Sequence, residues 1–273
     1  MSSSDSLSTN GTPIPASISG SSSPNPQKLF NINPANIIST TRDEKLDSVS
    51  SSEGPVPRTK ICVFCGASPG NSPAHMEGAR ALARVFHENN ISLVYGGGTV
   101  GLMGEVARTL VSLSGPDSVH GIIPAPLIKY ERGPDSKPSE ISSSALPEFS
   151  QYGHTTVVLD MHTRKQLFAA EVLLGGPGSG FIALSGGYGT LEELMEVITW
   201  NQLGIHNRGI VALNVEGYWD GLLAWANGAV EAGFVGEGNR SIFLEAKTPE
   251  EAVHMLSGYR NAEGRFKLSW GSE

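Results

Sequence analysis

The sequence of 273 residues contains only two cysteines, fewer basic than acidic residues and no long apolar run. Cys62 and Cys65 fall inside an apparent β-strand without a second pair, which excludes a four-cysteine zinc site and predicts buried, reduced thiols. The 19 Lys and Arg against 27 Asp and Glu give a net charge of −8. This balance argues against a nucleic-acid surface, because phosphate backbones are bound mainly through clustered cations. No segment has the uninterrupted apolar length that a membrane span requires.

Apolar residues are scarcest in residues 1–58, where Ser, Thr, Asn and Pro dominate. Such a segment cannot bury enough apolar surface to offset its ordering entropy, so it is predicted to be a disordered tail. It lacks the apolar core of a secretory signal, and its first basic residue is Lys28, which does not fit an Arg-rich transit peptide. We therefore expect a cytoplasmic protein with a folded domain at residues 59–260 and a C-terminal tail at 261–273.

From residue 60 onward, short apolar runs alternate with helical patterns. Expected strands cover residues 61–65, 91–95, 119–123, 157–159, 181–184, 209–214 and 242–244, and expected helices cover 73–89, 105–113, 161–174, 218–231 and 249–256. This alternation predicts an α/β fold, namely a single, doubly wound, Rossmann-like domain whose parallel sheet is covered on both faces. In such folds the ligand crevice lies beyond the carboxyl ends of the strands, where the glycine turns at 66, 96–101 and 186–189 would meet. The least regular segment, 127–155, has a length that is usually functional or disordered.

The stretch 181–202 combines a buried strand, the glycine-rich turn 185–189 and the start of a helix. Glycine lets a ligand approach the backbone closely, and the unpaired N–H groups of a helix N-terminus attract phosphate. Glu192 and Glu193 follow about 100° apart around the helix axis, so at most one of them is expected to face a ligand. Thr190 and Glu193 also match a capping box, and from the residues alone the cap is the favoured role of Glu193.

A second anion signal precedes the helix expected at 161–174. If Asp160 caps this helix, Arg164 and Lys165 lie near its first turn, where positive charge opposes the helix dipole. The reversed charge order indicates anion binding, although a surface pair of cations is more often simply solvated.

Gly96, Gly98 and Gly101 satisfy the pattern G-x-G-x-x-G and precede a helix. A dinucleotide site also needs an acidic residue at the end of the next strand to hold the ribose, whereas Asp117 precedes that strand. Packing alone also explains three glycines in a turn, so NAD binding is the minor interpretation. The seven histidines show no metal-ligand spacing, and no metal ion is expected.

Several motifs occur together in a fixed order: Val63–Ser68, Tyr95–Gly104, Gly121–Pro124, Met161–Lys165, Ser185–Glu193 and Val197–Trp200. This ordered set resembles the LONELY GUY family of cytokinin riboside 5′-monophosphate phosphoribohydrolases, whose members are sometimes labelled lysine decarboxylase-like. The resemblance covers nearly everything from residue 60 to about residue 256 and is far more specific than any single motif. It points to a fungal-type member with a long disordered N-terminus.

The resemblance implies roles for particular residues. The catalytic pair would be Arg164 and Glu193. The expected substrate-binding set is Glu131, Lys165, Gly186, Gly187, Tyr188, Gly189, Thr190, Leu191, Glu192 and Thr199, with further loop contacts from Gly66, Ser68, Gly97 and Gly98. The chain departs from the family pattern at Ser185, where proline is usual, and in the long Pro- and Ser-rich span that follows Glu131.

The same resemblance implies hydrolysis of the N-glycosidic bond of a cytokinin riboside 5′-monophosphate, with AMP as a second candidate substrate. Glu193 would stabilise the positive charge that develops on the ribose and orient or deprotonate the attacking water. A homodimer is implied, with a higher homo-oligomer as an alternative, and no cofactor is expected. The charge balance and the lack of a long apolar run predict no nucleic-acid partner and no membrane association. Two alternatives stay open: a non-catalytic nucleotide or cofactor carrier of related fold, and an NAD-dependent oxidoreductase.

Overall fold

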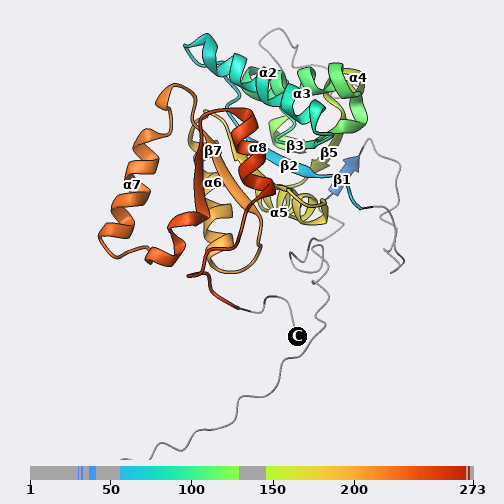
Figure 1. Ribbon diagram of the computed structural model, residues 1–273. Helices are drawn as coiled ribbons and strands as arrows, with labels where there is room; N and C mark the ends of the chain where they lie inside the picture. Colours follow the sequence, from blue (N-terminus) through green and yellow to red (C-terminus); the bar gives the residue numbers. More distant parts are fainter. Residues whose placement is uncertain are drawn as a thin grey trace, which may run out of the picture.

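The computed structural model describes Phe30, Ile32 and residues 37–40, 56–128, 146–268 and 270, which form an eight-stranded sheet flanked by helices (Figure 1). The strands are β1 (Ile37–Thr40), β2 (Lys60–Phe64), β3 (Ser92–Tyr95), β4 (Val119–Pro124), β5 (His154–Val158), β6 (Gly180–Ala183), β7 (Gly209–Leu213) and β8 (Phe243–Ala246). The α-helices are α2 (Pro73–Glu88), α3 (Gly101–Ser114), α4 (Phe149–Tyr152), α5 (Met161–Leu174), α6 (Tyr188–Gln202), α7 (Asp220–Glu231) and α8 (Pro249–Ser257). The predicted alternation of strand and helix is confirmed.

The strand order is β1-β5-β4-β3-β2-β6-β7-β8, and all neighbouring strands from β5 to β8 are parallel. The chain winds outward from β2 to β5 in one direction and from β6 to β8 in the other. The order therefore reverses between the adjacent strands β2 and β6. This confirms the doubly wound sheet, and an open sheet of this kind binds ligands at the switch point, beyond the carboxyl ends of the strands.

Both faces of the sheet are buried under helices. Ile61 and Val63 of β2 pack in the core formed with α2, α3 and α8, whereas Cys62 and Phe64 pack in the core formed with α5 and α6. Figure 1 shows α2 and α3 on one face of the sheet and α5 on the other. Because alternate side chains enter two different cores, β2 is apolar throughout. Both cysteines of the chain are buried and outside any disulfide, as predicted.

The helix α3 begins four residues before its expected start at 105, because two glycines of the preceding turn are absorbed into it. The N–H groups of Leu102 and Met103 donate to the carbonyl of Gly66, at 3.0 and 3.3 Å. At Gly101, φ is +58°, and a β-carbon would lie 2.3 Å from the backbone of Ala67. The close approach of two loops thus requires glycine at this position.

Parts of the ranges predicted to be tails pack on the domain. Within 1–58, β1 pairs antiparallel with β5, and the ring of Phe30 lies 5.4 Å from that of Trp200. Within 261–273, Trp270 donates its indole N–H to the carbonyl of Leu203 at 3.1 Å. Composition does not reveal these short segments, because their partners are distant in the sequence.

The substitution Gly101→Ala tests the close approach of the two loops. It introduces strain at positive φ and a clash with backbone that cannot move aside, so we expect the free energy of unfolding to fall by roughly 2–5 kcal/mol. Urea unfolding followed by circular dichroism measures this change. Gly228→Ala is the control, because nothing lies within 4 Å of a β-carbon there, and it should stabilise α7 by about 0.5–1 kcal/mol. Equal effects of the two substitutions would contradict the proposed packing.

Candidate active site

A cavity of about 840 Å³ opens at the switch point, where the loops after β2 and β6 meet. Four helices begin at its wall, contributing Ser72 and His75 of α2, Leu102 and Met103 of α3, Met161 and Arg164 of α5, and Gly189 and Thr190 of α6. Each helix turns the positive end of its dipole toward the same space, and the first turn of α6 has no capping side chain. The expected guest is therefore an anion.

Hydrogen bonds between the loops hold the wall of the cavity together. The N–H of Gly66 donates to the carbonyl of Ser185 at 2.9 Å, and the hydroxyl of Tyr218 donates to the carbonyl of Gly186. A β-carbon at Gly186 would lie 2.1 Å from Oγ1 of Thr190. Glycine at this position thus lets the loop fold back on the first turn of α6.

Arg164 is buried in the wall, with 6% of its surface exposed. Its Nη2 donates to the carbonyl of Gly96 at 3.1 Å and lies 3.9 Å from Oε1 of Glu193. The guanidinium stands over the ring of Phe168, 5.2 Å from its centre, and Nε has no hydrogen-bond partner among the described residues. A buried guanidinium with an unused donor is costly unless an anion completes it. Arg164 is therefore well placed to bind an anionic ligand.

Glu193 reaches the cavity from α6, with 11% of its side chain exposed. Burial raises its pKa to about 7, and the charge of Arg164 opposes this rise only in part. A carboxyl group that exchanges its proton near neutral pH is suited to act as a general base. The neighbouring Glu192 instead binds Lys165 at 2.6 Å, so a single carboxylate of this pair faces the cavity, as the helical spacing predicts.

The two predicted helix caps have opposite outcomes. The carboxylate of Asp160 accepts from the N–H of Thr163 at 2.9 Å and caps α5, as predicted. The prediction that Thr190 and Glu193 form a capping box is wrong, because α6 begins two residues before Thr190. Gly187 is at its N-cap position, and no side chain caps the helix. Glu193 thus lies in the second turn, free of the structural role that its local sequence favours.

The cavity brings together many of the predicted site residues, namely Gly66, Ser68, Arg164, Gly186, Gly187, Gly189, Thr190 and Glu193. Lys165 is not among its lining residues, because its ammonium group binds the carboxylates of Glu192 and Glu196 at 2.6 and 3.0 Å. Glu131 lies outside the described residues. Lys165 and Glu192 therefore contribute to how α5 and α6 pack rather than to the wall of this cavity.

Other predicted residues lie around the cavity. Tyr188 is 94% exposed and, with Leu191, lines an adjoining hollow of about 430 Å³. Thr199 lies further along α6, where its hydroxyl donates to the carbonyl of Met195 at 2.8 Å. Gly97 and Gly98 are buried and do not line the cavity.

Several lining residues have no role in the sequence-based prediction, and two of them, His75 and Tyr218, contact each other through their side chains. His75 lies in the first turn of α2, and Tyr218 directly follows the short helix η5 (Val215–Gly217). The usable signal for His75 was its place at the start of a helix that follows strand 61–65, since such a helix begins at the ligand edge of the sheet. Tyr218 gives no comparable local signal.

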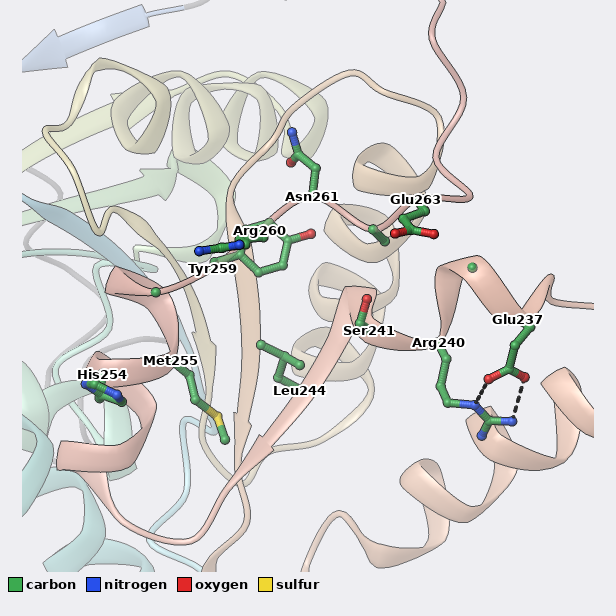
Figure 2. Close-up of a pocket in the computed structure, with 13 residues that line it drawn as sticks. Glu237, Arg240, Ser241, Leu244, His254, Met255, Tyr259, Arg260, Asn261 and Glu263 are labelled. Atoms are coloured by element: carbon green, nitrogen blue, oxygen red, sulfur yellow. Dashed lines mark hydrogen bonds and ion pairs between the residues drawn. The ribbon is translucent and has the colours of Figure 1, made fainter.

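A second hollow, of about 870 Å³, lies between η6 (Glu237–Ile242), β8 and the segment after α8 (Figure 2). Two arginines line it, Arg240 and Arg260, and the guanidinium of Arg240 is held by both carboxylate oxygens of Glu237, at 2.7 and 2.9 Å. An arginine whose charge is already neutralised binds an anion more weakly than Arg164 would. Of the predicted site residues that the structure describes, none lines this hollow.

Neither a cluster of metal ligands nor a membrane-crossing helix is present in the described part of the chain. Its His, Cys, Asp and Glu side chains form no group of three or more that could hold a metal ion. None of its helices combines the length and the apolar character that a membrane crossing needs.

Comparison with known proteins identifies clear relatives. A family model described as "Possible lysine decarboxylase" matches residues 103–256. The chain is 53% identical over 216 residues to the bifunctional cytokinin biosynthesis protein of Fusarium pseudograminearum, covering 79% of this chain and 43% of that protein. It is 41% identical over 216 residues to cytokinin riboside 5′-monophosphate phosphoribohydrolase LOG1 of Arabidopsis thaliana, covering 78% of this chain and 91% of that protein. A solved structure, the molybdenum cofactor carrier protein of Chlamydomonas reinhardtii, aligns at 17% identity and a TM-score of 0.48, covering 74% and 97% of the two chains.

The raised pKa of Glu193 predicts a pH-dependent stability. Because the pKa in the folded state, about 7, exceeds the usual 4.5, the folded chain binds the proton more tightly. The stabilisation is complete below about pH 4.5 and is lost as the pH rises through 7, by roughly 3 kcal/mol in all. Urea unfolding at pH 5 and pH 8 should therefore show Glu193→Gln gaining stability over the native chain as the pH rises. Glu192→Gln, on the exposed side of α6, is the control, and parallel pH profiles for the native chain and Glu193→Gln would contradict the assignment.

Proposed function

The chain belongs to the LONELY GUY family of cytokinin riboside 5′-monophosphate phosphoribohydrolases, and on this premise we propose that it hydrolyses the N-glycosidic bond of such a nucleotide. The products are the free base and ribose 5-phosphate, and AMP is a second candidate substrate. Since the chain spans 43% of the length of the bifunctional Fusarium protein, only the phosphoribohydrolase activity is proposed for it.

The observation that carries the proposal is the buried pair of Arg164 and Glu193 at a cavity where four helices begin. The 5′-phosphate binds to the N–H groups at the start of α6, between Gly187 and Thr190, where the helix dipole favours a negative charge. Arg164, whose side chain lines the cavity, binds the nucleotide and neutralises its negative charge. These contacts hold the ribose next to the Glu193 carboxylate.

The reaction follows from the chemistry of Glu193. As the bond between the ribose anomeric carbon and the base nitrogen breaks, its electron pair leaves with the base, and positive charge develops on the ribose. The carboxylate stabilises this charge and takes a proton from the attacking water, whose oxygen bonds to the anomeric carbon. The departing base takes up one proton, which balances the proton that Glu193 receives, and the net reaction consumes one water.

Product analysis with matched variants tests this activity. The full chain is incubated with isopentenyladenosine 5′-monophosphate, with AMP and with the unphosphorylated riboside, and free base is measured by chromatography. Glu193→Gln and Arg164→Ala should each lower kcat/KM by about 100-fold or more, because each removes a group that acts on the transition state. Glu192→Gln is the control, since this residue is the sequence neighbour of Glu193 but binds Lys165, and its activity should stay near that of the native chain.

The outcomes separate the competing functions. Release of base from no monophosphate, or full activity in Glu193→Gln, would rule out the hydrolase. Tight retention of an intact nucleotide without turnover would indicate a carrier instead. If the riboside were cleaved as fast as its monophosphate, the proposed phosphate site at the start of α6 would be wrong.

We further propose that the protein is a cytoplasmic homodimer. Trp225 and Phe234, at α7 and just after it, are 58% and 89% exposed, and exposed aromatic residues of this size favour a protein interface. Light scattering coupled to gel filtration should give twice the chain mass, and Trp225→Glu should shift it toward the monomer. A monomeric native chain would contradict the dimer. Cys62 and Cys65 form no disulfide, which suits a reducing compartment, and microscopy of a fluorescent fusion tests that location.

A further inference from the structure

Ser185 forms a hydrogen bond with a histidine from a distant element at the wall of the cavity. Its Oγ lies 2.9 Å from Nδ1 of His75, and both side chains line the cavity. Ser185 follows β6, whereas His75 lies in the first turn of α2. A side chain without a hydroxyl at position 185 could not make this bond, so the contact is specific to Ser185.

The imidazole ring of His75 is held by its surroundings on further sides. It packs edge-on against Tyr218, with ring centres 5.8 Å apart and planes 80° apart, and the hydroxyl of Tyr218 is bound to the carbonyl of Gly186. A β-carbon at Gly70, where φ is +74°, would lie 2.9 Å from Cδ2 of His75. The ring is thus fixed against the loop that leads into α6.

The bond with Ser185 uses Nδ1 and leaves Nε2 of His75 for a ligand. When the hydroxyl of Ser185 donates to Nδ1, the proton of the neutral ring lies on Nε2, across the ring from Ser185. Around the same cavity stand the guanidinium of Arg164, the carboxyl of Glu193 and the N-terminal ends of four helices. In such surroundings a fixed N–H donor complements an anion.

We propose that His75 is a phosphate-binding residue of this cavity, with Nε2–H donating to the 5′-phosphate of the nucleotide and Ser185 acting as its positioning residue. The inference rests on the proposed function for the identity of the ligand. It extends the phosphate site from the backbone at the start of α6 to a side chain at the start of α2. Two elements that begin on opposite faces of the sheet then share one phosphate.

Calorimetric titration of the full chain with ribose 5-phosphate, and separately with adenosine, tests the proposal. A hydrogen bond to a charged group predicts that His75→Ala weakens ribose 5-phosphate binding by about 10- to 100-fold. Ser185→Ala removes only the positioning contact and should weaken it by about 3- to 10-fold. Adenosine, which has no phosphate, should bind all variants equally.

His87→Ala is the matched control. His87 lies at the other end of α2, and its Nδ1 makes an equivalent bond to a serine, with Oγ of Ser114 at 2.8 Å. Loss of this bond should leave ribose 5-phosphate binding unchanged. In steady-state assays, His75→Ala and Ser185→Ala should raise KM for the monophosphate while kcat stays within about twofold of the native value, which a general loss of structure would not do.

Unchanged binding of ribose 5-phosphate in His75→Ala or in Ser185→Ala would overturn the proposal, as would an equal loss of adenosine binding. Circular dichroism and thermal unfolding check each variant, and if His75→Ala does not fold, Ser185→Ala decides the result alone. Binding of ribose 5-phosphate that depends on His75 in a chain that releases no base would leave this inference standing while the hydrolase failed. Confirmed hydrolysis with no effect at His75 would reject this inference alone.

Discussion

Much of the structure around the switch point depends on the burial of one guanidinium group. Nη2 of Arg164 lies so close to Gly96 that a β-carbon on this residue would be 2.1 Å from Nη2. The same Nη2 donates a hydrogen bond to the carbonyl of Gly96. Position 101, at the end of the same turn, must be glycine because a β-carbon there would clash with the backbone of Ala67. The glycine pattern that suggests a dinucleotide site is thus explained at these two positions by close packing, one of them around an arginine.

Those parts of the fold that rest on local sequence were predictable. The bounds of α5 agree with the prediction at both ends, because Asp160 caps its start and Gly175 stands at its C-cap position. The central strands follow from short apolar runs, which indicate burial on both faces whatever the rest of the chain does. The strand β1 and the four-residue α4 were not predictable, because β1 exists only through pairing with β5 and α4 is too short to show a period.

The candidate site was only partly predictable, for a related reason. The residues from Thr190 to Glu193 match a capping box in the sequence. In the structure, however, α6 starts two residues before Thr190, and the side chain of Thr190 lies against the loop at Gly186. Residue types alone therefore favoured the wrong role for Glu193, and the family resemblance favoured the catalytic one. His75 has no distinctive local pattern, and its relation to Ser185 exists only once β6 and α2 are brought to the same edge of the sheet.

The place of β1 in the sheet has a consequence for the solution behaviour of the protein. The outermost strand of a sheet presents unpaired backbone groups that can recruit a strand from another molecule. Here β1 runs antiparallel along β5 and occupies the backbone groups of β5, so that the exposed edge on this side is the four-residue, irregularly paired β1. A chain shortened to begin at residue 56 would retain its parallel strands but leave β5 as an open edge. We expect such a truncated chain to aggregate edge to edge before it loses catalytic activity.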